Sequence, residues 1–323
     1  MNLPPRKVAV VDIGSNSTKV LIALVNTNGE VVKVREEGFS CRLIDKGNIS
    51  SAIISREKRK ELLSGLSRLL KICTQEGVSD AILVATEAIR TSLNADELEK
   101  DIFENFSKNL FVLSGKKEAE LIAQGILLEP QVTGQENFQA FDLGGGSLEI
   151  IDFNKNSQIV TKSLRLGALT IKEKFSSNEI KILDEEMAKN INGQISSQLN
   201  QTEFRKDSTI PMLGLGGVVY FIRKILSAKN SIKFEEKKEI SYDEICELTH
   251  ESLNKSLLEI INRFPDLPRD RADVFPFACL VIQGLMKRLS KKSFFHSTYN
   301  LRYGVASNLG NVVQGLSFLA KSK

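Results

Sequence analysis

The sequence contains 323 residues, of which 41% are hydrophobic and 26% are charged, and its formal net charge at pH 7 is +4. This length suits one large or two medium domains with a buried core, and the small net charge gives no reason to expect a general nucleic-acid role. There is no run of about 18 apolar residues and no apolar core of a signal peptide near the start, so we expect a cytoplasmic protein with neither a membrane nor a nucleic acid as its partner.

Histidines and cysteines are too few for several common kinds of chemistry. His250 and His296 are the only histidines, and we expect them to be surface or packing residues. The four cysteines form no C-x-x-C pair, which is typical of buried free thiols in a reducing compartment; they are Cys41, Cys73, Cys246 and Cys279. Acids, glycines and arginines must therefore carry any reaction.

The first part of the chain predicts strands followed by alternating strands and helices. Residues 7–35 indicate a three-strand meander, in which Asn26-Thr27-Asn28-Gly29 supplies a hairpin turn. Leucines at helical spacing predict an amphipathic helix at 55–75. The other elements expected before residue 130 are strands at 81–85 and 110–113 and helices at 95–106 and 116–128, the last of them capped by Ser114.

The second half repeats this order, which favours an α/β fold. The expected elements are a second meander at 139–142, 147–153 and 158–164, helices at 167–175 and 183–203, a strand at 210–213, helices from Tyr220 onward and a final helix at 307–320. We predict two domains, 1–125 and 126–302, with a C-terminal helix within 303–323 completing the first.

Two stretches share one plan: a buried strand ends in an acid, a turn rich in glycine and serine follows, and a second strand begins. In the first, Asp12 precedes Gly14, Ser15, Asn16 and Ser17; in the second, Asp142 precedes Gly144, Gly145, Gly146 and Ser147. Glycines let backbone N–H groups point into one concavity, where they attract phosphate oxygens. We expect two phosphate-binding loops that face each other across a cleft.

Asp142 and Glu149 stand on either side of the second turn. Carboxylates combined with substrate oxygens and water are the ligands that Mg²⁺ prefers, so this pair is a candidate site for Mg²⁺ or another divalent cation. The alternative is that Asp142 only accepts hydrogen bonds within the turn.

These loops, with Gly214-Leu215-Gly216-Gly217, resemble those of the actin-like ATPase, sugar-kinase and Hsp70 superfamily. Further stretches are similar to motifs of one family within it, the exopolyphosphatase/guanosine-pentaphosphate phosphohydrolase (Ppx/GppA) family; they are Val84 to Arg90 with Asn94, Leu113 to Ala119, Ser163 to Ala168, and Arg271-Ala272-Asp273. The motifs follow the family's order from about residue 7 to 305. The resemblance implies two actin-like (ribonuclease H-like) domains that flank an inter-domain cleft, in the short form of the family.

Three segments depart from the family pattern. Gly214-Leu215-Gly216-Gly217-Val218 lacks both threonines of the family's segment, Arg302-Tyr303-Gly304 lacks its acid, and Arg42-Leu43 is followed by Ile44-Asp45-Lys46-Gly47. These changes leave the predicted reaction centre intact, but they leave open which substrate the protein recognises.

The resemblance also suggests roles for single residues. Glu118 is the expected general base, and Glu120 is the alternative base on the same predicted helix. Asp142 and Glu149 are the expected metal ligands, and Arg42 and Arg90 are expected to make bidentate phosphate contacts beside Asp12 and the two loops. Other interpretations stay open. Either arginine could form a surface ion pair, and Glu118 could be an acid that the helix dipole favours at that position. Gly216 and Gly217 could mark a close helix–strand contact instead of the place where the superfamily's kinases hold adenosine.

We therefore predict an exopolyphosphatase that releases terminal phosphate from inorganic polyphosphate by metal-assisted hydrolysis. Hydrolysis of guanosine pentaphosphate (pppGpp) is the close alternative, because the same residues serve both reactions. Two different classes of protein also stay open, namely an ATP-dependent kinase and a non-catalytic sensor of polyphosphate or the alarmone. The resemblance further implies a homodimer.

Overall fold

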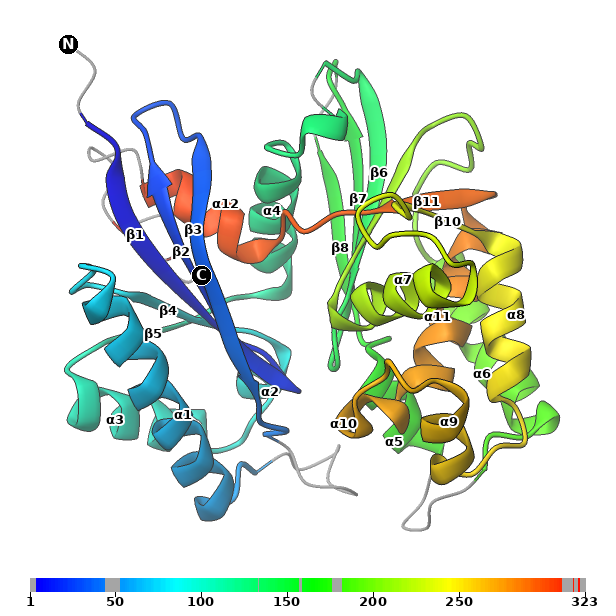
Figure 1. Cartoon of the computed structure of the whole chain (residues 1–323), viewed down its shortest axis with the longest axis horizontal. Helices are drawn as coiled ribbons and strands as arrows, with labels where there is room; N and C mark the ends of the chain where they lie inside the picture. The colour runs from blue at the N-terminus through cyan, green and yellow to red at the C-terminus, as the bar shows by residue number, and fades with distance from the viewer. Residues whose placement is uncertain are drawn as a thin grey trace. The chain divides into compact units, whose positions relative to one another are not determined.

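The computed structural model describes residues 4–43, 53–132, 134–156, 159–175, 182–309, 316 and 319. The chain divides into two compact units (Figure 1). Unit 1 comprises Met1–Thr133 and Tyr299–Lys323, and unit 2 comprises Gly134–Thr298. Each unit has its own mixed sheet, so the predicted α/β class is confirmed.

The sheet of unit 1 has the strand order β3-β2-β1-β4-β5. Its strands are β1 (Arg6–Ile13), β2 (Ser17–Val25), β3 (Val31–Ser40), β4 (Ile82–Ala85) and β5 (Leu110–Val112). The first three form the predicted antiparallel meander, and β4 and β5 run parallel to β1. The Asn-Gly turn lies where it was expected, since Gly29 takes a φ of 80° and donates its N–H to the carbonyl of Asn26.

The helices of unit 1 lie on both faces of its sheet. They are α1 (Arg56–Gln75), α2 (Glu87–Arg90), α3 (Ala95–Phe106), α4 (Gly115–Ile126) and α12 (Leu301–Leu309), with a 3₁₀ turn, η1, at Pro130–Val132. The alternate residues Ala9, Val11 and Ile13 of β1 share a core with α1 and α3. Ser114 caps α4 as predicted, because its Oγ accepts the N–H of Lys117 at 3.2 Å.

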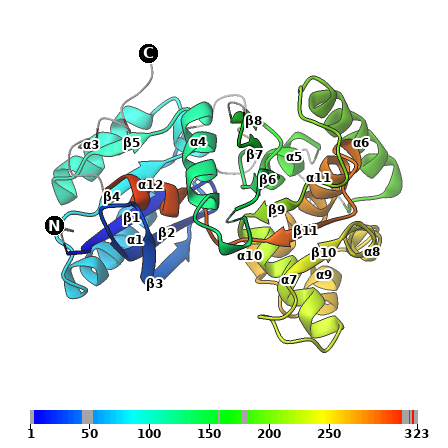
Figure 2. The same ribbon diagram turned by 90° about the horizontal axis from the view of Figure 1, so that it is seen from above.

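The last described helix, α12, lies beside α4 in both views (Figures 1 and 2). It begins at Leu301, earlier than expected, because the side chain of Asn300 accepts the N–H of Arg302 at 3.1 Å and so caps its start. Most of the expected helix beyond residue 309 falls outside the described residues.

Two glycines let α4 and α12 approach to backbone contact. A Cβ at Gly304 would stand 1.8 Å from the carbonyl oxygen of Leu121, and one at Gly125 would stand 2.3 Å from that of Asn300. Any side chain at either position would push the helices apart.

The sheet of unit 2 has the order β10-β11-β9-β6-β7-β8. Its strands are β6 (Asn137–Leu143), β7 (Leu148–Asn154), β8 (Val160–Leu164), β9 (Met212–Leu215), β10 (Glu239–Ser241) and β11 (Ser293–His296). The meander β6-β7-β8 is as predicted, although residue 158 of the expected third strand lies outside the described residues. The sequence did not predict β10 or β11, and β9 includes Gly214, which the rings of Phe294 and Phe141 cover.

The helices of unit 2 are α5 (Ala168–Phe175), α6 (Glu185–Asn200), α7 (Gly217–Lys229), α8 (Tyr242–Ser252), α9 (Leu257–Arg263), α10 (Arg269–Ala272) and α11 (Phe275–Arg288). The strongly apolar α11 is the centre of this layer and packs against α5, α6 and α8. Of the four cysteines, all free, Cys246 is only half-buried, so the prediction of buried thiols is wrong for that residue. None of the described helices has the length and apolar character needed to span a membrane.

The two units repeat one design. Read from the meander edge, β3-β2-β1-β4-β5 of unit 1 matches β8-β7-β6-β9-β11 of unit 2 in order and direction. Both acid–glycine turns close with the same hydrogen bond, from Gly14 N to Ser17 O at 3.1 Å and from Gly144 N to Ser147 O at 3.0 Å. The repeat read from the sequence is therefore present in the fold.

Candidate active site

The acidic pair predicted in unit 2 is brought together by the strand register. Asp142 in β6 lies directly opposite Glu149 in the antiparallel partner β7, so the two side chains share one face with Cβ atoms about 5 Å apart. Glu149 is almost fully buried and accepts a hydrogen bond from Ser163 Oγ, on β8, at 2.6 Å. Like charges placed directly opposite each other destabilise a sheet, and a bound cation would relieve that repulsion.

The glycine turn between these acids is held by its carbonyl oxygens. The N–H groups of Ala168 and Leu169 at the start of α5 bond to the carbonyls of Gly144 and Gly145, and Thr170 Oγ1 bonds to that of Gly146 at 2.8 Å. In a trans peptide the next N–H points away from the carbonyl, so the N–H groups of Gly145, Gly146 and Ser147 are directed away from α5. The turn can therefore present several amides to an anion, as its composition predicts.

Neighbouring backbone segments can approach this turn and strand β6 closely because two further positions of unit 2 are glycines. A Cβ at Gly167 would lie 2.3 Å from the carbonyl carbon of Gly146, and one at Gly216 would lie 2.3 Å from Leu143 O and 3.2 Å from Asp142 Oδ1. Gly216 also takes a φ of 112°. Of the two interpretations of Gly216 and Gly217, the close contact between strand and helix describes Gly216, while adenosine binding stays a prediction.

The equivalent loop of unit 1 is pinned in a similar way. The carbonyls of Ser15 and Asn16 accept the N–H groups of Leu43 and Cys41, both at 3.2 Å, and Arg42 Nε donates to Asn16 Oδ1 at 3.0 Å. Arg42 thus lies at the loop where phosphate binding was predicted for it. Ser15 and Asn16 are buried.

Charge distinguishes the two loops. Asp12 lies opposite Lys19 in the register of β1 and β2, at the place where Asp142 faces Glu149 in unit 2. Burial raises the pKa of Asp12 above its usual range, and the charges of Arg302 and Lys19 offset part of that rise. Unit 1 thus pairs its acid with a cation of its own, whereas unit 2 pairs its acid with a second acid.

Glu118, the predicted base, is buried at the start of α4 and contacts Arg90. Nη1 of Arg90 donates to Glu118 Oε2 at 2.8 Å and to the carbonyl of Leu113 at 2.6 Å. Parallel neighbouring strands end at one edge of a sheet, so α2 after β4 and α4 after β5 begin side by side. This arrangement brings the two side chains together over 28 residues of sequence.

The sequence did not single out Glu87, which is the other partner of Arg90. Its Oε2 accepts from both Nε and Nη2 of the guanidinium, at 3.1 and 2.5 Å. Burial alone would lower the pKa of Arg90, but Glu118 and Glu87 together raise it. Arg90 therefore lies between two carboxylates, and a phosphate contact by this residue stays a prediction. The spacing of Glu87 and Arg90, three residues apart on a helix, was the available signal.

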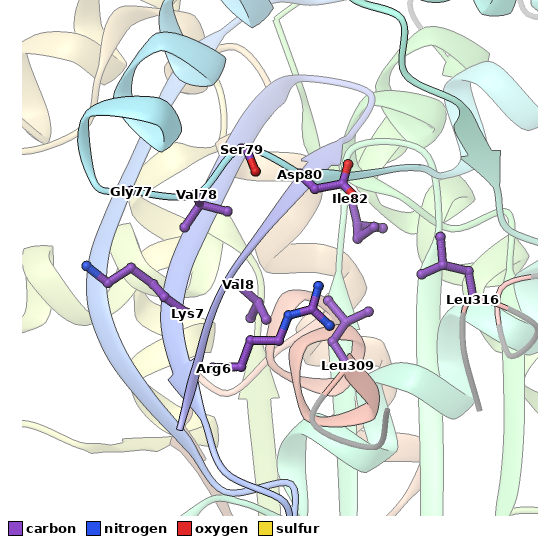
Figure 3. A pocket seen from close by; sticks show the side chains of 10 residues that line it. All are labelled: Arg6, Lys7, Val8, Gly77, Val78, Ser79, Asp80, Ile82, Leu309 and Leu316. Atoms are coloured by element: carbon purple, nitrogen blue, oxygen red, sulfur yellow. The ribbon is translucent and has the colours of Figure 1, made fainter. Parts of the chain in front are cut away.

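A cavity of about 250 Å³ lies elsewhere in unit 1 (Figure 3). It is found at the start of β1, where Arg6, Val8 and Leu309 line it. Asp12 lies four residues beyond Val8, about 13 Å further along that strand. This cavity is separate from the residues described above.

Paired sheets of this topology, each with an acid and a glycine or serine turn at the end of its first strand, define the two-domain actin-like fold. Two solved structures share this fold. A Ppx/GppA family member from Aquifex aeolicus has a TM-score of 0.77 and 22% identity, and the match covers 96% of this chain and 99% of that one. An exopolyphosphatase from Cytophaga hutchinsonii has a TM-score of 0.79 and 22% identity, and the match covers 95% of this chain and 98% of that one. The profile of the Ppx/GppA phosphatase family matches residues 21–310. The chain belongs to this family.

Three relatives differ in how much of their own length is matched. A bifunctional 3-dehydroquinate synthase/phosphatase of Fusobacterium nucleatum is 24% identical over 88% of this chain and 43% of its own length. A Haemophilus influenzae protein, named as a candidate exopolyphosphatase, is 22% identical over 94% of this chain and 91% of its own length. A guanosine-5'-triphosphate,3'-diphosphate pyrophosphatase of Pseudoalteromonas translucida is 24% identical over 94% and 59%. The chain thus spans only about half the length of two of these relatives.

Proposed function

We propose that this protein is an exopolyphosphatase that hydrolyses the terminal phosphoanhydride of inorganic polyphosphate with the help of a divalent cation. The observation that carries the proposal is the placement of Asp142 opposite Glu149 at a turn whose amides are directed away from α5. Charge neutralisation and positioning are the main needs of phosphoryl transfer, and this turn offers groups for both.

The chemistry of the two carboxylates fits Mg²⁺. Among the described residues no set of three or more histidine, cysteine, aspartate or glutamate side chains forms a metal cluster. Mg²⁺ is usually held by one or two carboxylates together with substrate oxygens and water, so Asp142 and Glu149 match its needs. When bound, the cation would neutralise charge on the phosphate oxygens.

The protein's own groups supply the remaining functions. The N–H groups of Gly145, Gly146 and Ser147 would bind phosphate oxygens, as would those of the loop at Gly14 to Ser17 in unit 1. Glu118 would accept a proton from the attacking water through its carboxylate. Its contact with Arg90 fixes the orientation of that carboxylate.

Hydrolysis of pppGpp is the second candidate, and the relative from Pseudoalteromonas translucida supports it. Polyphosphate is favoured because the candidate exopolyphosphatase of Haemophilus influenzae matches over 91% of its own length, against 59% for the pyrophosphatase. The homodimer, the cytoplasmic location and the absence of nucleic-acid binding stay predictions.

The test is Mg²⁺-dependent phosphate release from polyphosphate and, in parallel, from pppGpp. We expect Glu118→Gln to lower kcat on polyphosphate by about 100-fold or more while substrate binding is retained. Glu120→Gln is the matched control, because Glu120 lies on the same helix but its side chain is 40% exposed and pairs with Lys117.

Each other result has a definite meaning. Release from pppGpp alone would replace polyphosphate by the alarmone as substrate. Binding without turnover would indicate a sensor, and ATP-dependent transfer to an acceptor would indicate a kinase. Full activity of Glu118→Gln would show that Glu118 is not the base.

A further inference from the structure

We propose that Glu87 is a positioning residue for the general base: it occupies the Nε/Nη2 edge of Arg90, so that Arg90 gives Glu118 one hydrogen bond, from Nη1, instead of a side-on bidentate pair. This inference rests on the proposed function, in which Glu118 is the base. Within the motif-like stretch Val84 to Arg90, the segment Ala85-Thr86-Glu87-Ala88-Ile89-Arg90 corresponds to the family's A-T-x-A-x-R motif, in which x is any residue. Glu87 stands at the first x, so the motif itself assigns it no role.

The geometry divides the guanidinium between two acids. Glu87 Oε2 accepts from Nε and Nη2, while Nη1 alone bonds to Glu118 Oε2, at 2.8 Å. A bidentate arginine–carboxylate pair needs two neighbouring nitrogens. Because Glu87 occupies the edge formed by Nε and Nη2, the side-on bidentate pair of the guanidinium is not available to Glu118.

The third anchor is the backbone at the end of β5. Nη1 also donates to the carbonyl of Leu113 at 2.6 Å, which keeps the guanidinium between α2 and α4. The side chains of Glu87, Arg90 and Glu118 are 10%, 18% and 8% exposed, so water screens their interactions only weakly. If these side chains exchanged hydrogen-bond partners, the basicity of Glu118 would therefore change strongly.

The consequence concerns basicity. A carboxylate that accepts two charge-assisted hydrogen bonds from a guanidinium holds a proton less well than one that accepts a single bond, because each bond stabilises the charged form. Without the charge of Glu87, Arg90 can turn its free Nε/Nη2 edge toward Glu118, and Glu118 then becomes a weaker base. The negative charge of Glu87 also favours proton uptake by its neighbour.

The test compares Glu87→Gln, Glu87→Asp and Glu97→Gln in the same phosphate-release assay. We expect Glu87→Gln to lower kcat about tenfold with KM changed less than about twofold, since proton transfer rather than binding is affected. Glu87→Asp keeps the charge and should restore most of the activity. Glu97 is an exposed partner of Arg59 in the same unit, so Glu97→Gln should match the wild type. An unchanged kcat in Glu87→Gln, or a rise in KM at constant kcat, would overturn the inference.

A second measurement does not depend on turnover. If the wild type hydrolyses neither substrate, the proposed function falls, and urea unfolding of Glu87→Gln, Glu118→Gln and the double variant decides the positioning claim. Each acid compensates for loss of the other at Arg90, so the midpoint shift of the double variant should exceed the sum of the single shifts. Additive shifts would show that the two acids do not share Arg90.

Discussion

Replacing Gly304 by alanine should destabilise unit 1, although alanine is the better helix former. The new Cβ would stand 1.8 Å from the carbonyl oxygen of Leu121, so α12 would have to move by about 1.2 Å to bring that contact to 3.0 Å. Overpacking of this kind costs about 1–3 kcal/mol, and the upper part of the range applies because the obstacle is backbone. After the gain of about 1 kcal/mol in helix propensity, we expect a net loss of about 2 kcal/mol.

Gly193 in α6 provides the matched control for this substitution. A Cβ there meets no atom within 4 Å, so Gly193→Ala should stabilise unit 2 by about 0.5–1 kcal/mol. The same exchange thus has opposite signs at the two sites. Urea unfolding followed by hydrogen exchange, read separately from peptides of each unit, measures both effects. A Gly304→Ala protein as stable as the wild type in α4 and α12 would refute the reasoning.

Three further predictions concern unit 2. Burial lowers the pKa of Lys291 to about 8, whereas its pKa in the unfolded chain is 10.5. Between these two pH values the unfolded chain binds more protons than the folded one, so stability should rise with pH across that window. Thermal unfolding of Lys291→Met should lack this rise. Asp142→Asn removes the repulsion with Glu149, so its melting temperature without divalent cations should equal or exceed that of the wild type, while Mg²⁺ should raise only the wild-type value. Asp152 accepts hydrogen bonds from both the backbone and the side chain of Arg205, so Asp152→Ala should cost about 2 kcal/mol in urea unfolding; a loss below about 0.5 kcal/mol, the size of an ordinary surface substitution, would contradict this role.

Local signals predicted most of the fold. The hairpin at Gly29, the cap at Ser114 and the leucine spacing of α1 each lie within a few residues of the element they define, and the structure has all three. The strands β10 and β11 were missed because they become strands by pairing with each other and with β9. Their own sequence carries too little periodicity to indicate a strand.

The candidate site was predictable where its parts are close in sequence. Asp142 and Glu149 flank one turn, so their approach follows from a hairpin register. The bond from Ser163 to Glu149 depends on a third strand, and the contact of Gly216 with β6 depends on a strand more than 60 residues away. Partners of this kind are fixed by strand order, which sequence periodicity does not determine.

The discontinuity of unit 1 has a consequence for its synthesis. Most of this unit comes from the first 133 residues, but α12 follows unit 2 in the chain. The ion pair of Arg302 with Glu36 closes a loop of 266 residues, which is a slow kind of contact to form. On the ribosome the sheet of unit 1 emerges without the helix that packs on α4, whereas the strands of unit 2 emerge as one continuous segment. The half of the protein that is translated first is thus the half that is completed last.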